Sequence, residues 1–254
     1  HMPSASGILK QGVVVMSTVW AASVAPARAF VGSGAISSQL LRPRSFTQGA
    51  RSLRAADGKN VFLVNGHQKW PFAKGELNAA FFKTAKDHFK SSGYETKETI
   101  VEDGWTVEEE LEKFQWADYV FYQTPCFWMG QPWLFKKYFD EVFSGGMGGQ
   151  MCTSDGRHKE TPEDGYGTGG TLNAKYMLSL TFNAPKGAFE RKDQYLFQGK
   201  TVDDLWFPFH MNQRFCNLEQ LPTFSCHDVL KNPKIEEDMA RFKAHLVAHF
   251  PADK

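Results

Sequence analysis

Short apolar runs alternate with stretches of helical spacing along most of this chain, and that alternation restricts its fold more than any other feature. The runs at 60–65 and 118–123 are short and largely apolar, which is typical of parallel strands buried on both faces of a sheet. Residues 94–101, between them, alternate in the manner of a strand. Apolar residues at helical spacing separate these runs, at Leu77, Phe81, Ala85 and Phe89 and again at Val107, Leu111 and Phe114. The pattern therefore begins β-α-β-α-β.

The second half of the chain continues the same alternation. An aromatic stripe that starts at Trp133 predicts a helix over 133–143, and the runs at 176–182 and 221–226 predict the fourth and fifth strands. Apolar residues three and four positions apart predict a closing helix over 235–250. Alternation of this kind implies an α/β fold with a doubly wound, five-stranded parallel sheet and helices on both faces.

Ligands of such sheets bind beyond the carboxyl ends of the strands, where the direction of winding reverses. The loops that follow Asn65, Gln123 and Phe182 are therefore the candidate site. The fold alone does not identify the ligand, so the residues in these loops have to indicate it.

Acidic residues are absent from the first 56 positions, and all 28 of them follow. Six of the 29 Lys and Arg residues lie in this leader, which leaves 23 basic against 28 acidic residues and a net charge of −5 on the body. This boundary predicts a leader at 1–56 that is removed, followed by one catalytic domain at 57–254. A negative body argues against a nucleic-acid-binding protein.

Two kinds of targeting signal follow each other in the leader. An apolar run at 12–25 and the sequence Ala27-Arg28-Ala29 resemble a signal peptide ending at Ala29, and residues 30–56 have the acid-free, Ser- and Arg-containing composition of a transit peptide. This order is similar to that of the bipartite presequences of algae with a red-algal-derived plastid, and it predicts a plastid location. The alternatives are a mitochondrial presequence and a tail without targeting function. The apolar run is too short and too interrupted to predict a membrane span.

Four cysteines are widely spaced and form neither a CxxC pair nor a cluster with histidine: Cys126, Cys152, Cys216 and Cys226. The spacing predicts no metal site and no disulfide framework, and it favours free thiols in a reducing compartment.

The first candidate loop leads from Asn65 into the start of a helix, where free backbone amides and the helix dipole favour an anion such as a pyrophosphate. The loop contains neither GxGxxG nor GxxxxGKS, so it is neither a Rossmann dinucleotide loop nor a Walker A loop. A plain turn is the alternative interpretation.

Large aromatic side chains occupy the second candidate loop, 124–133. Phe127, Trp128 and Trp133 either cover a flat apolar ring or pack onto the next helix. A glycine-rich segment at 165–170 precedes a strand, which favours a mobile loop that carries Tyr166. Residues 181–185 end a strand with polar groups suited to the edge of a heteroaromatic ligand.

Taken together, these motifs closely resemble the modulator-of-drug-activity B family of bacterial NADPH:quinone reductases, which is related to DT-diaphorase and has a flavodoxin-like fold. The resemblance covers about residues 60 to 250 and is carried by Val64-Asn65-Gly66, Gly75-x-Leu77-Asn78, Trp116-Ala117-Asp118, Trp128-Met129-Gly130-x-Pro132-Trp133, Lys136-Lys137-Tyr138, Ser154-Asp155-Gly156-Arg157, Tyr166-Gly167-x-Gly169-Gly170, Lys175-Tyr176-Met177-Leu178-Ser179-Leu180-Thr181, Pro208-Phe209-His210 and Leu221-Pro222-Thr223-Phe224.

The resemblance implies bound FAD, NADPH or NADH as co-substrate, a quinone as acceptor, and a homodimer. It places the pyrophosphate and adenosine at 73–80 and the isoalloxazine against the second and fourth loops, with Tyr166 closing over the ring. The implied cofactor-binding residues are Ala73, Lys74, Gly75, Glu76, Leu77, Asn78, Pro125, Cys126, Phe127, Trp128, Met129, Tyr166, Thr181, Phe182, Asn183 and Ala184. Two positions depart from the family: Ala73 replaces a hydroxyl residue, and Cys126 replaces glycine.

The mechanism expected of such an enzyme is ping-pong hydride transfer, in which the nicotinamide reduces the flavin, leaves, and is replaced by the quinone. Phe127, Trp128 and Phe182 would form the aromatic slot, and Tyr166 or His210 would deliver a proton; a core histidine is the alternative for His210. Two other functions remain open: a flavodoxin-like single-electron carrier, which usually has a strongly acidic face, and a flavin-free scaffold, which Ala73 keeps in consideration.

Overall fold

The structure, a computed structural model, describes residues 59–252. The predicted leader and its two targeting signals lie outside these residues and stay predictions. The strands and helices of the described part are, in chain order, β1 (Asn60–Asn65), α1 (Glu76–Ser91), β2 (Glu95–Ile100), α2 (Val107–Trp116), β3 (Tyr119–Pro125), α3 (Trp133–Gly145), β4 (Ala174–Thr181), α4 (Val202–Leu205), α5 (Phe207–Phe215), β5 (Leu218–Gln220), β6 (Phe224–Cys226) and α6 (Ile235–His249).

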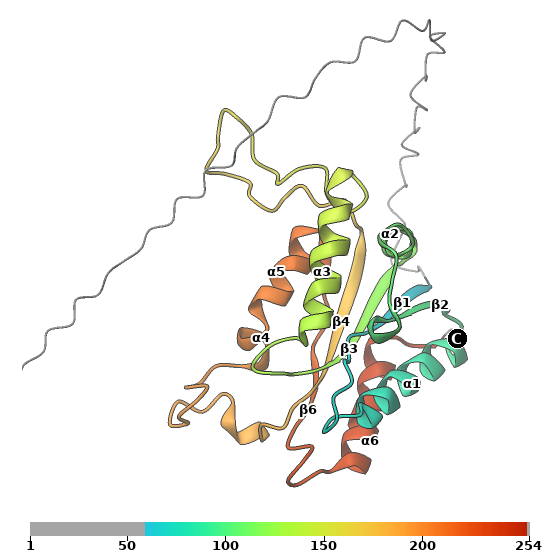
Figure 1. The fold of residues 1–254 in the computed structure, drawn as a ribbon, viewed down its shortest axis with the longest axis vertical. Coiled ribbons are helices and arrows are strands. Elements are labelled where there is room, and N and C mark those ends of the chain that lie inside the picture. Colours follow the sequence, from blue (N-terminus) through green and yellow to red (C-terminus); the bar gives the residue numbers. More distant parts are fainter. Residues whose placement is uncertain (1–58, 253–254) are drawn as a thin grey trace, which may run out of the picture. The chain divides into compact units, whose positions relative to one another are not determined.

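The strands form a parallel sheet in the order β2-β1-β3-β4-β5, with β6 also paired to β4 (Figure 1). The described part of the chain begins with the central strand β1, moves outward to β2, and then returns past β1 to β3 before it continues in the other direction. This order confirms the predicted doubly wound α/β fold, and it places the reversal between β1 and β3.

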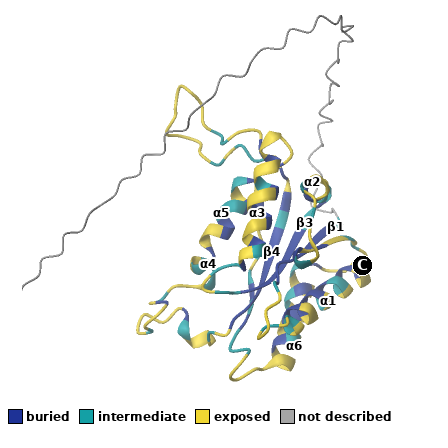
Figure 2. Cartoon of the chain, in the orientation of Figure 1, coloured by how far each residue is buried: buried dark blue, intermediate teal, exposed yellow. Residues whose placement is uncertain are grey.

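Helices cover both faces of the sheet because its central strands are apolar on both sides. In β1, Val61 and Leu63 face the core shared with α1 and α6, while Phe62 and Val64 face the core shared with α2, α3 and α5. Successive side chains of a strand point to opposite faces, so one short apolar run serves two cores. Figure 2 shows β1, β3 and β4 as the buried centre of the fold.

The predicted fifth strand, 221–226, is wrong in detail. Two short strands, β5 and β6, share that edge position, and both pair with β4. Leu221 still donates its backbone N–H to the Tyr176 carbonyl at 2.8 Å, but Pro222 follows it and has no N–H to donate. The edge strand is therefore interrupted at the proline.

Two helices, α4 and α5, were not predicted from the sequence. A capping box starts α4, in which Thr201 and Asp204 exchange side-chain-to-backbone hydrogen bonds. In α5, Pro208 occupies the first turn, where a missing N–H costs nothing. The capping box and the proline are local signals for the start of a helix, but the residues between these two signals lack the regular apolar stripe that would predict one.

Substitution of Phe89 tests the packing of the core between the sheet and α1. Its ring is fully buried and makes edge contacts with Tyr94, Phe121 and Phe250. We expect Phe89→Ala to lower the free energy of unfolding by about 3–5 kcal/mol, because it removes buried surface and leaves a cavity. Phe72→Ala is the matched control: that ring is 82% exposed, and its loss should change stability by less than about 0.5 kcal/mol. Urea unfolding measures both, and equal midpoints would contradict the assignment.

Candidate functional site at the carboxyl edge of the sheet

Three of the candidate loops meet where β1, β3 and β4 end. Gly66 donates its N–H to the carbonyl of Gln123 at 2.9 Å, which joins the first loop to β3. Cys126 donates its N–H to the carbonyl of Thr181, also at 2.9 Å, which joins the second loop to β4. The structure thus brings together the loops that the sequence predicted to form the site.

A chain of buried amides holds the start of α1 against these strand ends. Asn78 Nδ2 donates to Asn65 Oδ1 at 2.7 Å, and Gln123 Nε2 donates to Asn78 Oδ1 at 3.1 Å. Asn65 Oδ1 also accepts the backbone N–H of His67 at 3.1 Å. Asn78, predicted to bind the cofactor, therefore has its side chain inside the protein, where it fixes the position of the helix.

The first turn of α1 is open to an anion. Its N-cap is Gly75, in the left-handed region with φ of 84°, and no side chain caps the helix. A Cβ at this position would lie 2.4 Å from the His67 ring, so the turn requires glycine. Uncapped first-turn amides fit a phosphate group. Lys74 and Glu76 are exposed beside them, and Leu77 is half-buried.

His67 lies under this turn and stays neutral. Burial lowers the pKa of its ring, and the nearby carboxylate of Glu102 opposes that effect without reversing it. The imidazole therefore adds no positive charge to the helix end at neutral pH. Ala73 is half-buried and exchanges two backbone hydrogen bonds with Trp70, each 3.0 Å long, which shape the loop without a hydroxyl at position 73.

The second loop makes a strained turn. Phe127 and Gly130 exchange backbone hydrogen bonds of 2.8 and 3.1 Å, and the two residues between them, Trp128 and Met129, have φ of 45° and 65°. A turn with positive φ at both central positions normally carries glycine or asparagine. Bulky residues there cost on the order of 1–2 kcal/mol each, and such strain clusters at functional sites. The turn leaves Trp128 98% exposed.

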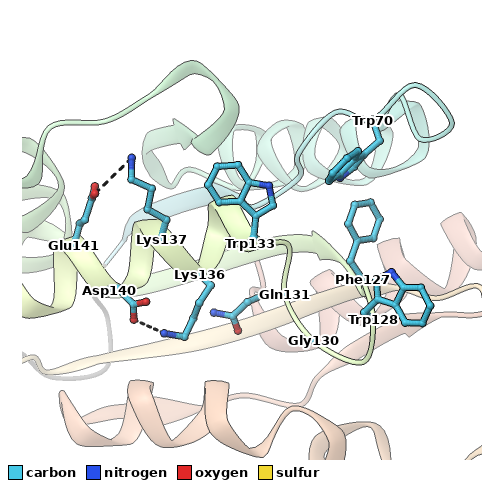
Figure 3. A pocket seen from close by; sticks show the side chains of 10 residues that line it. All are labelled: Trp70, Phe127, Trp128, Gly130, Gln131, Trp133, Lys136, Lys137, Asp140 and Glu141. Atoms are coloured by element: carbon cyan, nitrogen blue, oxygen red, sulfur yellow. Dashed lines mark hydrogen bonds and ion pairs between the residues drawn. The ribbon is translucent and has the colours of Figure 1, made fainter. Parts of the chain in front are cut away.

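Beside this turn lies an open groove of about 680 Å³, a volume suited to a flat organic ring system. Figure 3 shows its lining, with aromatic side chains toward one end and two lysine–carboxylate pairs toward the other. The lining residues are Trp70, Phe127, Trp128, Gly130, Gln131, Trp133, Lys136, Lys137, Asp140 and Glu141.

Sequence reasoning missed part of this groove. Trp133, which the sequence left either to cover a flat ring or to pack onto the helix, is 60% exposed at the first position of α3 and lines the groove. Lys136 and Lys137 follow it three and four positions later, and that spacing on a helix places them beside Trp133. Trp70 had no signal of its own, because its contact with the groove depends on the turn it forms with Ala73.

The remaining predicted flavin contacts are partly inside the protein. Burial raises the pKa of the Cys126 thiol to about 11, so it is protonated at neutral pH. Phe182 is buried and stacks flat on His227, with ring centroids 5.2 Å apart. Because the Phe182 ring is buried and His227 covers one of its faces, it does not line the groove. This corrects its expected part in the aromatic slot. Pro125 and Thr181 are buried, Asn183 is exposed, and Ala184 is half-buried.

Tyr166 lies at the other end of the sheet. Residues 153–169, here called the glycine-rich arm, follow α3 and precede β4, so they leave from the amino edge (Figure 1). Tyr166 is 70% exposed, packs edge-on against Phe215 with centroids 5.6 Å apart, and has Arg157 over its ring. The expectation that it closes over a ring held by the second loop therefore fails within one chain, since α3 separates the two loops.

His210 is buried between β4, α4 and α5. Its Nδ1 is 2.7 Å from the hydroxyl of Tyr176, and its Nε2 is 3.2 Å from Asp203 Oδ1. The His210 ring beside it holds the pKa of Asp203 below its usual range. Both ring nitrogens face protein groups, and this position offers no contact with a substrate in the groove. The geometry thus corresponds to the alternative of a core histidine.

Residues 59–252 contain neither a cluster of metal-ligating side chains nor a membrane-spanning helix. In this part of the chain no group of three or more His, Cys, Asp or Glu side chains is placed to hold a metal ion. Nor does it contain a helix with the length and apolar character needed to cross a membrane.

Comparison with known proteins agrees with this architecture. The family model described as "Flavodoxin-like fold" matches residues 59–250. The NADPH:quinone oxidoreductase MdaB of Haemophilus influenzae is 46% identical over 188 residues, which cover 74% of this chain and 97% of that protein.

Two solved structures share the fold. A putative quinone reductase from Klebsiella pneumoniae superposes with a TM-score of 0.59 at 20% identity, over 77% of this chain and 86% of that one. General stress protein 14 from Treponema denticola, solved in complex with FMN, superposes with a TM-score of 0.51 at 18% identity, over 75% and 98% of the two chains. The chain belongs to the flavodoxin-like family and, within it, to the group of MdaB-like oxidoreductases.

Proposed function

We propose that this chain is an NAD(P)H:quinone oxidoreductase that binds FAD at the carboxyl edge of its sheet. The observation that carries the proposal is the strained turn at Trp128 and Met129, which holds bare aromatic surface beside the uncapped start of α1. Exposed aromatic surface is costly in water, and a phosphate-binding helix end next to it fits a ligand that has both a flat ring and a phosphate. The similarity to MdaB supports the same reading.

The residues present fit FAD in three places. The backbone amides of Glu76 and Leu77, at the uncapped end of α1, would hold the pyrophosphate. Phe127 and Trp128 would cover the isoalloxazine. The backbone at 181–184 would contact the polar edge of the ring, since the Phe182 side chain is engaged with His227.

A bound flavin supplies two-electron chemistry, by which a reduced nicotinamide and then a quinone react in turn at one site. The protein's own contribution is to orient both substrates and to exclude water. Trp70, Phe127 and Trp133 provide apolar walls for a flat substrate. Cys126 takes no part as a nucleophile, because its thiol stays protonated at neutral pH.

A second copy of the chain would complete this site. Tyr166 is exposed on the arm, against Phe215 at the end of α5, and cannot reach the groove of its own chain. In a two-fold dimer each subunit presents the same surface to the other, so an arm at one edge can meet the groove at the opposite edge of its partner. We therefore retain the proposed role of Tyr166 over the flavin, but from the other subunit of a homodimer.

Two other functions remain to be distinguished from this one. A single-electron carrier would accept the same cofactor but would deliver electrons one at a time. A flavin-free scaffold would bind neither FAD nor FMN. The groove is lined with aromatic residues and balanced lysine–carboxylate pairs and lacks the strongly acidic face usual for such carriers, which favours the reductase.

Stopped-flow absorbance under nitrogen tests the reaction. After FAD loading and mixing with NADPH and then benzoquinone, we expect one hydroquinone formed per NADPH consumed, with no quinone radical in the electron paramagnetic resonance spectrum.

Trp128→Ala should weaken FAD binding about tenfold, whereas Trp128→Phe, which keeps an aromatic face, should restore most of it. A radical product would favour the carrier, failure to bind either flavin would favour the scaffold, and FMN bound in preference to FAD would correct the cofactor.

Subunit mixing tests the role of Tyr166. We expect Trp128→Ala and Tyr166→Ala each to lower activity, because each damages every site in its own homodimer. Unfolding and refolding the two variants together should restore about a quarter of wild-type activity, since half of the random dimers are mixed and each mixed dimer has one intact site. A mixture no more active than the mean of the two variants would show that the arm does not act across the dimer.

The protonated state of Cys126 can be measured by alkylation. The thiolate is the reactive form, and the pKa of about 11 lies above the usual 9.0. The rate of Cys126 modification by iodoacetamide, followed by peptide mass spectrometry, should therefore rise about tenfold per pH unit from pH 7 to 10. In urea-unfolded protein the rise should level off near pH 9. A folded-state rate that is already level at pH 8 would contradict the assignment.

A further inference from the structure

Two cysteines outside the proposed site lie side by side. The Sγ atoms of Cys152 and Cys216 are 3.5 Å apart, although 64 positions separate them in the chain. Both residues are buried, at 0% and 2% exposure. Cys152 lies at the base of the glycine-rich arm, and Cys216 is the C-cap of α5.

The backbone on both sides holds this contact in place. Cys152 pairs with Gly170 across the base of the arm, and a Cβ at Gly170 would lie only 2.4 Å from the backbone of Cys216. Leu172 donates its N–H to the Cys216 carbonyl at 3.2 Å, and Asn217 Nδ2 donates to the Leu172 carbonyl at 2.8 Å. The two backbones are therefore already close together, and closing a bond of about 2 Å between the sulfurs needs a shift of roughly 1.5 Å.

We propose that Cys152 and Cys216 form an oxidisable dithiol, and that peroxide converts it to a disulfide that ties the base of the glycine-rich arm to the end of α5. In the first step one thiol loses its proton, its thiolate attacks a peroxide oxygen, the O–O bond breaks, and the leaving hydroxide takes that proton, so that a sulfenic acid and water form. In the second step the other sulfur attacks the sulfenic sulfur, the S–O bond breaks, and a second water leaves. Two thiols and one hydrogen peroxide thus give one disulfide and two waters, and a dithiol reductant reverses the change.

The other two cysteines are placed elsewhere. Cys126 lies at the carboxyl edge, in the second loop, whereas the arm leaves from the amino edge. Cys226 packs on the opposite face of the sheet, with α6, and its Sγ is 2.9 Å from Asp238 Oδ2. Within the described residues, which contain all four cysteines of the chain, the pair is therefore specific.

Burial sets the rate of this chemistry. It raises the pKa of both thiols. Cys152 raises the pKa of Cys216 further, whereas the hydrogen bond with Cys216 partly offsets the effect of burial on the pKa of Cys152. Oxidation by peroxide should therefore be slow at pH 7 and faster at pH 9. A neighbouring sulfur within reach also captures the sulfenic acid before further oxidation. The inference goes beyond the proposed reductase activity, because it concerns stability and covalent state and does not require flavin.

Peptide mapping and thermal unfolding test the proposal on the full chain. After reduction and removal of the reductant, hydrogen peroxide at pH 9 should leave two of the four thiols titratable in denaturant and produce one peptide pair linked through Cys152 and Cys216. The melting temperature should rise by at least about 5 °C, because the link closes a long loop, and dithiothreitol should reverse the rise.

Single-residue variants separate this pair from general oxidation. Cys152→Ser should give neither the linked peptides nor the rise in melting temperature, whereas Cys126→Ser, the matched control, should give both. If Cys152→Ser does not fold, the peptide map of the wild-type protein decides by itself. Recovery of Cys152 and Cys216 as free thiols, as sulfinic or sulfonic acids, or in links between chains would overturn the proposal.

Discussion

The buried amide chain through Asn65, Asn78 and Gln123 is the interaction on which the rest of the site depends. It joins the ends of β1 and β3 to the start of α1, and so fixes an uncapped helix end at the edge where the sheet reverses its winding. Buried amides need partners, and here each partner belongs to a different element. These contacts therefore place the proposed phosphate-binding position next to the loop that follows β3.

Strain and exposure at that loop complete the site. Hydrogen bonds between Phe127 and Gly130 hold Trp128 and Met129 in the left-handed region, a conformation that neither side chain favours. The result is an aromatic surface that faces the groove and does not fold back into the core. A ligand ring that covers it removes that surface from water, and this burial would contribute to binding.

The sequence predicted the layers of the fold and the loops of the site, because both follow from local patterns. Buried parallel strands have a distinctive apolar run, and parallel strands bring their carboxyl ends to one edge. What failed depended on contacts distant in the chain. Phe182 belongs to the core because His227 stacks on it, and His210 is held between Tyr176 and Asp203. Tyr166 carries a family motif, but its side of the sheet is set by the direction of α3, which no motif reports.

The glycine-rich arm is the segment through which a second subunit would contribute to the proposed flavin site. It carries Tyr166 against Phe215, and its base rests on Cys152 and Cys216, so the proposed dimer and the proposed disulfide would both affect its position. A crystal structure of the FAD-loaded protein tests the central claim most directly. It should show the ring against Phe127 and Trp128, the pyrophosphate at the start of α1, and Tyr166 of a second copy over the ring. Flavin bound elsewhere, or a groove without flavin in protein saturated with FAD, would contradict the account.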